Sequence, residues 1–247
     1  MNSINLIKNL IEQKNKDELN HYLINIWNQV WSDKSQFNYA NLRLFKAIDK
    51  LKNLSEMGID FNNKYVLDIG CGNGATLLYL QKYFNIRGLG VDISDQVVNE
   101  LQLKLKNNNL SFAINDHRDL SSLDSNQFDI ILSFGVIEHF AEYGLALSEA
   151  RRVLKPGGKL VLIQPHLFSF GVIQKYCLKF KNKWKFGKQK DLSCFYYCQF
   201  LRKLGYKNIK FKTMPPYPDM KITRIFDLTI RKVIPFWGHY LYLIGEK

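Results

Sequence analysis

The stretch VLDIGCGNG, residues 66–74, decides the fold, because an apolar run ends there in three glycines separated by single residues. Residues 65–69 favour extended structure with little polar alternation, which is typical of a strand covered on both faces. The glycines can adopt backbone angles closed to other residues and let the chain pass close to a ligand. Leu77, Leu80 and Phe84 then recur at helical spacing. The sequence therefore predicts a strand, a ligand-binding turn and a helix whose free amides point back toward the turn.

Two acidic residues indicate which ligand the turn holds. The turn reads G-x-G-x-G rather than the dinucleotide pattern G-x-G-x-x-G, and Asp68 stands directly before it. A carboxylate there would repel a pyrophosphate, whereas S-adenosylmethionine carries an ammonium and a sulfonium and no phosphate. Asp92 ends a second short strand, 22 residues after Gly70, where a carboxylate can accept both hydroxyls of a ribose. That second spacing serves any adenosine cofactor.

Three further blocks complete the pattern. Residues 111–117 read as a strand ending in an acid, and residues 128–139 as a strand followed by GVIEH. Residues 152–163 read as a helix end, a Pro-Gly-Gly turn and a buried strand. Over about residues 64–164 the five blocks resemble the class I S-adenosylmethionine-dependent methyltransferases, especially the type 11 group that includes ubiquinone- and menaquinone-pathway enzymes. Five blocks in the right order are far more specific than one glycine motif.

The alternation of strands and helices, with the resemblance, predicts the fold class. We expect an α/β fold, a doubly wound, Rossmann-like, mainly parallel seven-stranded sheet with an antiparallel last strand, plus N-terminal helices and lid insertions. The expected helices lie near residues 74–84, 94–107, 140–154 and 193–204, and the two closing strands at 206–212 and 239–246.

The chain is predicted to be one domain with a cap. Residues 1–60 read as three helices that form an N-terminal helical cap, and residues 61–247 form the methyltransferase domain. Insertions are expected at about 165–192 and 213–235. The cap contains an aromatic cluster that we expect to pack against the main domain, with ligand contact as an additional role. Its members are Trp27, Trp31, Phe37 and Tyr39.

Composition excludes several classes of protein. The chain is 46% hydrophobic and 23% charged, and no stretch approaches the eighteen or so apolar residues of a membrane span. The start lacks a long apolar core, so we expect a cytoplasmic protein with reduced thiols. Cys194 and Cys198 share a helix face, which we interpret as packing, and no cysteine spacing predicts a metal. The net charge of +13 fits an anionic partner but also a Lys-rich composition.

The resemblance implies a set of cofactor-binding residues in the loops that follow the strands. They are Asp68 directly before the first turn and Gly70, Cys71, Gly72, Asn73 and Gly74 in it, Asp92 and Ile93 at the end of the second strand, Asp116 and His117 at the end of the third, and Phe134 and Gly135 at the end of the fourth. Asp116 stands where an adenine edge would lie. Arg43, within NLRL, is similar to an arginine that reaches the cofactor's carboxylate in the ubiquinone-pathway O-methyltransferases. A position on a solvated helix face is the alternative.

Methyl transfer is an in-line displacement from a sulfonium, so few residues need be catalytic. His139 is the candidate general base, because neutral imidazole titrates near working pH. Packing against the cofactor is the alternative role. Related enzymes carry an additional acid three residues before this Glu-His pair, and some bind a divalent ion there. Because that position is Gly135, we predict no metal site.

The insertion at 165–192 interleaves aromatic residues with lysines, which suits an amphipathic, anionic or nucleic-acid substrate. A solvated helix and loop is the alternative. The main hypothesis is methyl transfer to an O or N atom of a small-molecule or lipid-like metabolite. The alternatives are a tRNA-base methyltransferase, with nucleic acid as partner, and a non-catalytic S-adenosylmethionine-binding partner subunit. The oligomeric state stays open.

Overall fold

The computed structural model describes residues 21–32, 42–105, 109–184, 187–216 and 221–247. A predicted helix near the start of the chain, Phe37 and Tyr39 lie outside these residues. No helix in the described ranges is long and apolar enough to cross a membrane.

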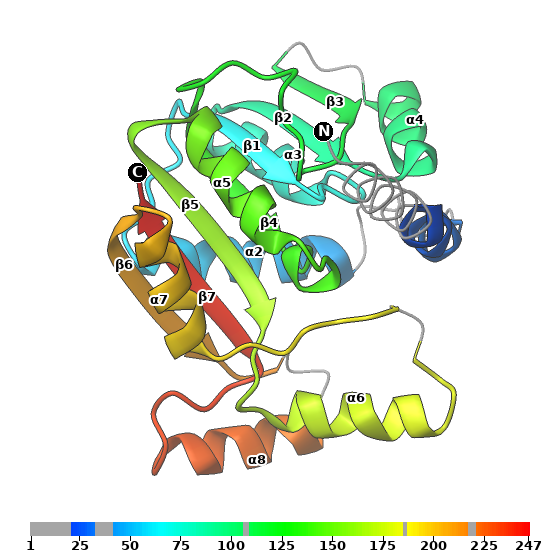
Figure 1. Ribbon diagram of the computed structural model, residues 1–247, viewed down its shortest axis with the longest axis vertical. Helices are drawn as coiled ribbons and strands as arrows, with labels where there is room; N and C mark the ends of the chain where they lie inside the picture. The colour runs from blue at the N-terminus through cyan, green and yellow to red at the C-terminus, as the bar shows by residue number, and fades with distance from the viewer. Residues whose placement is uncertain (1–20, 33–41, 106–108, 185–186, 217–220) are drawn as a thin grey trace, which may run out of the picture.

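One seven-stranded sheet has the order β3-β2-β1-β4-β5-β7-β6 (Figure 1). Strand β7 runs antiparallel to both of its neighbours, and every other pair of neighbouring strands is parallel. This confirms the predicted mainly parallel sheet with an antiparallel last strand. The strands are β1 (Tyr65–Ile69), β2 (Arg87–Asp92), β3 (Leu110–Ile114), β4 (Phe128–Phe134), β5 (Leu154–Pro165), β6 (Lys207–Met214) and β7 (Tyr240–Glu246).

Helices cover both faces of the sheet. One apolar cluster joins the sheet to Leu54 of α2, Leu77 of α3 and Leu101 of α4, and a second joins it to Ala150 of α5 and Tyr197 of α7. Burying a large apolar side chain contributes roughly 1.5–3 kcal/mol, so these two layers hold the sheet in place. The labelled helices are α2 (Leu42–Glu56), α3 (Ala75–Phe84), α4 (Asp95–Lys104), the short 3-10 helix η2 (Ile137–His139), α5 (Tyr143–Val153), α6 (Phe170–Phe180), α7 (Cys194–Lys203) and α8 (Lys221–Arg231). Residues 21–31 are also helical.

The strand register brings the predicted ligand loops to one edge of the sheet. Ile69 pairs with Val91 on β2 and with Ser133 on β4, so the residues that follow these three strands lie side by side. In a parallel sheet this carboxyl edge is where ligands bind, because the connecting loops diverge there.

The Pro-Gly-Gly sequence differs from its prediction. Residues 156–158 were expected to form a turn before the fifth strand, yet they lie inside β5, where the pairing with β4 shifts register. Gly157 takes a φ of +75°, which favours glycine. The chain end satisfies the backbone here, since Gly157 N–H donates to Lys247 O at 3.3 Å and Lys247 N–H donates to Gly158 O at 3.0 Å. The glycines therefore form an irregularity within a longer strand.

Cys194 and Cys198 are buried, free and part of the second apolar cluster, which confirms the packing interpretation. Helices α6 and α8 lie side by side beyond the end of β5, away from the two layers that cover the sheet (Figure 1). Phe170 of α6 and Phe226 of α8 join them with ring centroids 5.5 Å apart.

Candidate functional site

The glycine turn after β1 combines unusual backbone angles with tight packing. Gly70, Gly72 and Gly74 have φ of +69°, +50° and +73°. The amides of Gly70 and Cys71 donate to Val91 O at 2.8 and 3.0 Å, which fixes the turn against β2. A Cβ on Gly72 would lie 2.6 Å from the ring of Trp31. Glycine is therefore required at Gly72 both by its φ and by the neighbouring indole.

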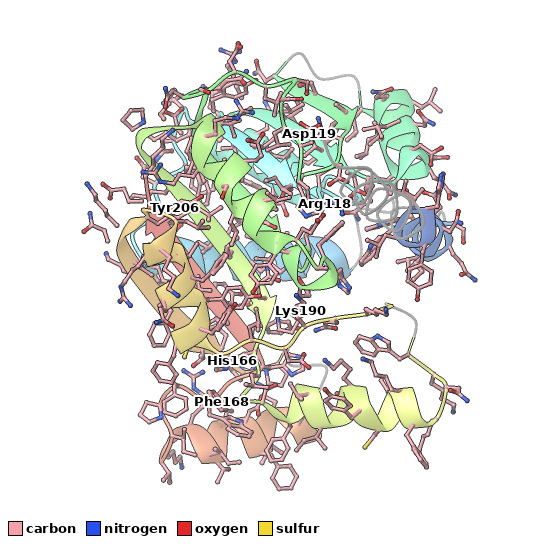
Figure 2. All side chains as sticks on the ribbon, viewed as in Figure 1. Arg118, Asp119, His166, Phe168, Lys190 and Tyr206 are labelled. Carbon is pink, nitrogen blue, oxygen red and sulfur yellow. The ribbon has the colours of Figure 1, made fainter. Side chains whose placement is uncertain are left out.

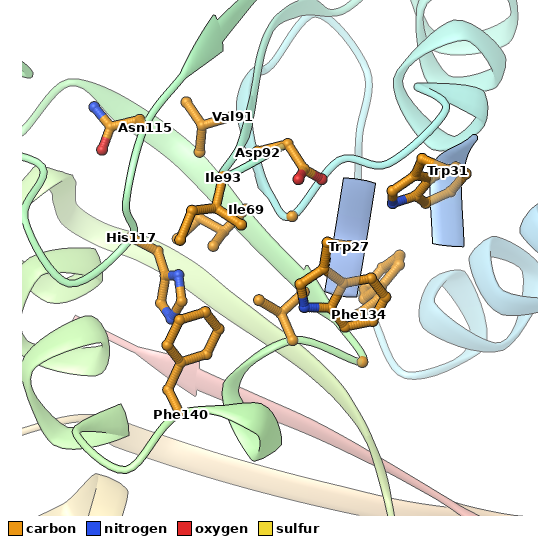
Figure 3. Close-up of a pocket in the computed structure, with 13 residues that line it drawn as sticks. Trp27, Trp31, Ile69, Val91, Asp92, Ile93, Asn115, His117, Phe134 and Phe140 are labelled. Atoms are coloured by element: carbon orange, nitrogen blue, oxygen red, sulfur yellow. The ribbon is translucent and has the colours of Figure 1, made fainter. Parts of the chain in front are cut away.

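Two adjoining cavities open at this edge of the sheet. The first, of about 110 Å³, lies between the ends of β1, β2 and β4 and the helix at 21–31 (Figure 3). The second, of about 350 Å³, lies between the glycine turn, the start of α3 and the middle of α2. Trp31, Gly70 and Phe134 line both cavities, so the two form one elongated site.

Opposite charges meet in the second cavity. Asp68 is buried there, and burial raises the pKa of its carboxyl to about 7 despite the attraction of Lys50. Lys50 lines the same cavity and places its ammonium 5.1 Å from the ring centroid of Phe134. A carboxylate and an ammonium in one cavity can bind the ammonium and the carboxylate of an amino acid.

Asp92 occupies the first cavity. Its carboxylate accepts hydrogen bonds from Gly72 N–H and Ser94 N–H, both at 3.0 Å. Burial raises the pKa of Asp92, and these two hydrogen bonds oppose the rise. Two amides thus orient the carboxylate, and its remaining lone pairs can accept hydroxyl groups.

The loop after β3 departs from the predicted arrangement. Asp116 does not line either cavity, because the guanidinium of Arg118 binds its carboxylate. Asn115 and His117 line the first cavity instead, although Figure 3 shows the Asn115 amide turned away from Asp92. Burial lowers the pKa of His117 to about 4, so its ring is neutral at pH 7. Its Nε2 has no hydrogen-bond partner within the described ranges and is available to a ligand.

Two tryptophans from the N-terminal helix close the first cavity. Both tryptophans line the cavity, and Figure 3 shows Trp27 next to Phe134. The helix is attached to the start of α4, since Asn28 bonds to Ser94 Oγ at 2.5 Å and to Asp95 Oδ1 at 2.9 Å. Trp27 and Trp31 therefore lie on a helix that packs on the main domain, and both face the cavity.

His139 lies beside these cavities rather than in them. Its ring is buried against Trp27, with centroids 5.1 Å apart. Nδ1 lies 3.0 Å from Lys188 O, and because a carbonyl only accepts, Nδ1 carries the proton and Nε2 carries the lone pair in the neutral ring. Nε2 is 3.7 Å from Oε1 of Glu138. Burial raises the pKa of Glu138 to about 8, so this carboxyl is largely protonated at pH 7.

The remaining predicted cofactor-binding residues lie in three kinds of place. Cys71, Asn73, Ile93, Phe134 and Gly135 line one or both cavities, whereas Gly74 begins α3 as its left-handed cap. Arg43 lies in the first turn of α2, and its side chain lies outside the described structure. Sequence reasoning missed Lys50. Lys50 and Ala47 lie three positions apart on one side of α2 and both line the second cavity, but this spacing alone does not distinguish Lys50 from the other lysines of the helix.

A third cavity, of about 290 Å³, lies between α6 and the ends of β5 and β7. It contains a buried ion pair between Lys175 and Asp191, whose side chains are 3% and 7% exposed. Asp191 Oδ1 and His239 Nδ1 are buried there without a hydrogen-bond partner in the described part of the chain. The cavity thus offers both polar atoms and apolar walls to a second ligand.

Part of the chain matches a known protein family. Residues 67–162 match the family model described as a methyltransferase domain (Methyltransf_11). Over 226 residues the chain is 26% identical to the phosphoethanolamine N-methyltransferase of Plasmodium falciparum, covering 86% of this chain and 78% of that protein. Over 128 residues it is 32% identical to the fatty-acid O-methyltransferase of Mycolicibacterium smegmatis, covering 51% of this chain and 44% of that protein. The chain spans about half the length of several curated relatives that it matches.

The fold is similar to that of solved methyltransferases. A chain in the complex between the Haloferax volcanii Trm112 methyltransferase activator and a methyltransferase superposes with a TM-score of 0.68 at 20% identity, covering 89% of this chain and 96% of that chain. The family match identifies residues 67–162 as a class I methyltransferase domain, an enzyme domain. Its cofactor is S-adenosylmethionine, and the paired charges of Asp68 and Lys50 suit the amino-acid end of that molecule.

Proposed function

We propose that the whole protein transfers a methyl group from S-adenosylmethionine to an O or N atom of a small-molecule or lipid-like metabolite. The elongated double cavity carries this proposal, because it places Asp68 and Lys50 at one end and Asp92 toward the other. S-adenosylmethionine is a nucleoside joined to an amino acid, so it needs one group of residues for its amino-acid end and a separate group for its ribose.

Bound S-adenosylmethionine supplies an electrophilic methyl group on its sulfonium. In our proposal the ionised Asp68 binds the ammonium, while Lys50, with Arg43 as a second candidate, binds the carboxylate. Asp92 accepts the ribose hydroxyls, and His117 Nε2 contacts the adenine edge. Asp116 would act through Arg118, holding the loop rather than touching the base. The walls are completed by Gly70, Cys71, Gly72, Asn73, Ile93, Phe134 and Gly135.

We place the acceptor in the third cavity and under the segment that covers His139. Lys190 N–H donates to Glu138 O at 2.8 Å, and Lys188 O accepts from His139, so residues 187–190 shield this ring. His139 would act as general base once this segment and Trp27 move aside. The insertions at 165–192 and 213–235 would then be lids, and residues 1–60 a cap. A fatty acid and phosphoethanolamine stand in the names of two relatives, which supports small or lipid-like acceptors.

A labelled-methyl assay tests this function. The protein is incubated with S-adenosylmethionine carrying a deuterated methyl group, together with a metabolite extract, a lipid extract or total tRNA. Mass spectrometry then finds which fraction gains the label. We expect labelled metabolites or lipids. Label in tRNA alone would favour base methylation, and label in no fraction, despite tight cofactor binding, would favour a non-catalytic partner subunit.

A further inference from the structure

Helix α8 presents its apolar side to solvent and its polar side to the protein. Ile225 is 64% exposed and Val233, just after the helix, is 83% exposed. On the opposite side, Asp227 is fully buried and accepts a hydrogen bond from Trp237 Nε1 at 2.7 Å. Arg224 donates to Pro216 O at 2.6 Å. An amphipathic helix on a water-soluble surface normally has the reverse orientation.

Helix α6 carries a second exposed apolar stripe. Ile173, Tyr176 and Phe180 recur at positions i, i+3 and i+7, and are therefore on one side of the helix. All three are exposed, and Phe180 is 91% exposed. The inward side of the same helix carries Lys175 and Leu178, which line the third cavity.

The two stripes lie at the same end of the molecule, because α6 and α8 pack against each other beyond the sheet (Figures 1 and 2). We call this surface the α6–α8 face. Its apolar members are Ile173, Tyr176, Phe180, Ile225, Leu228 and Val233.

The charge around the α6–α8 face has one sign. Residues 165–190 contain no Asp or Glu, and residues 220–245 contain only Asp227, which is buried. Exposed cations follow both stripes, with Lys181 and Lys183 after Phe180 and Lys232 beside Val233. The face therefore combines apolar side chains with lysines and has no exposed acid in its described part.

We propose that the α6–α8 face docks the protein onto an anionic lipid surface. Apolar side chains on one side of a helix enter the boundary between headgroups and acyl chains, and neighbouring lysines attract anionic headgroups. A second copy of this chain fits the face less well, because pairing two copies would bring their lysines together without opposing acids.

Docking in this orientation has a consequence for the acceptor. The third cavity lies directly behind α6, so a docked α6 holds that cavity next to the lipid layer. This consequence rests on the proposed function, whereas docking itself does not. The two are separable, because vesicle binding is measured without any methyl transfer.

The test compares two double variants of the full chain. Phe180→Glu with Val233→Glu removes two exposed apolar side chains from the α6–α8 face and adds two negative charges. Tyr83→Glu with Leu103→Glu makes the same chemical change on α3 and α4, at exposures of 58% and 76%, near the other end of the molecule. Circular dichroism checks that both variants fold. Binding is measured by co-sedimentation with phosphatidylcholine vesicles containing about 30% phosphatidylglycerol, at low and high salt.

We expect the unmodified protein to bind these vesicles, and added salt to weaken the binding. The α6–α8 variant should bind at least about tenfold more weakly, and the control variant within about twofold of the unmodified protein. Absence of binding by the unmodified protein would overturn the proposal, as would equal losses in both variants. A dimer in sedimentation velocity that the α6–α8 variant alone abolishes, without vesicle binding, would assign the face to a second copy instead.

Discussion

Asp92 is the residue on which the cofactor interpretation depends most directly. Its carboxylate is buried, oriented by Gly72 and Ser94, and faces the first cavity. Replacing Asp92 with alanine removes a charged hydrogen-bond partner from a desolvated site, which costs on the order of 1.5–3 kcal/mol. We therefore expect affinity for S-adenosylhomocysteine, measured by calorimetry, to fall by about one to two orders of magnitude. The control is Asp119→Ala, which replaces an exposed acid. Equal affinities of the two variants for S-adenosylhomocysteine would show that Asp92 does not bind the cofactor.

Glu138 gives a prediction that does not depend on the cofactor. Burial raises its pKa to about 8 in the folded protein, against an ordinary value of 4.5. The folded state therefore binds more protons than the unfolded state between these pH values, so Glu138 contributes stability below pH 4.5 that is lost as pH rises through 8. Glu138→Gln removes this dependence.

We expect the free energy of unfolding of Glu138→Gln, from denaturant titrations at several pH values, to fall less steeply from pH 5 to 8.5 than that of the unmodified protein. Glu56→Gln is the matched control, because Glu56 is half exposed. Parallel pH curves for Glu138→Gln and the unmodified protein would show that this carboxyl is not perturbed by folding.

For single residues, the sequence predicted which ones lie at the cavities better than it predicted which side chains contact one another. Asp68, Asp92, Gly70 and Gly72 lie at or just after the ends of strands whose order fixes their positions, and all four line the cavities. The sequence could not show that Arg118 binds Asp116, because that contact depends on the path of a loop. Nor could it distinguish Lys50 from the other lysines of α2 without knowing which side faces Phe134.

Elements were predictable where the local pattern was strong. The strand, turn and helix from 65 to 84 combine periodicity with glycine, and they have the expected order and nearly the expected bounds. The turn predicted for the Pro-Gly-Gly stretch was wrong, because Gly157 and Gly158 form backbone hydrogen bonds with Lys247 at the far end of the chain, which a local pattern cannot show. The inverted orientation of α8 was also invisible, because periodicity marks an apolar side but not the direction in which it faces.

In our proposal the segment from α6 to Leu192 is the element most directly coupled to methyl transfer. It covers His139 through Lys188 O and Lys190 N–H, and it borders the third cavity. Replacing residues 180–190 with a short Gly-Ser linker should leave S-adenosylhomocysteine affinity within a few-fold, since none of the residues described at 180–184 and 187–190 lines the first two cavities. Turnover on the acceptor identified by the labelled-methyl assay should fall by orders of magnitude, because water would reach the site. If turnover is retained, the segment is not a lid and is only part of the protein surface.

At the scale of the whole molecule, the salt dependence of binding distinguishes a tRNA substrate from a small-molecule or lipid-like one. The chain carries a net charge of +13, and RNA binding through such charge depends on phosphate contacts and counterion release. If tRNA is the substrate, its affinity in a filter-binding or fluorescence assay should fall steeply and linearly on a log–log plot against salt. We expect instead no measurable tRNA binding at physiological salt. Tight binding with a steep slope would favour the tRNA-base alternative.

The sheet order was the most predictable property of the whole molecule. Five sequence blocks fix β1 to β5, and connections between parallel strands have one hand, so few arrangements remain. The placement of α6 and α8 beyond the sheet could not be predicted, because their packing depends on ring contacts such as Phe170 with Trp237, far apart in the sequence. The parts that could be predicted are those in which local pattern and sheet geometry agree.

We infer that the double cavity beyond β1, β2 and β4 binds S-adenosylmethionine. The most direct measurement is a calorimetric titration of S-adenosylhomocysteine into the unmodified protein. We expect saturable binding with one site per chain, and we expect it to be lost or strongly weakened when Asp68 and Asp92 are both replaced by alanine in a variant that still folds. Absence of binding to the unmodified protein, or unchanged binding in the double variant, would contradict it.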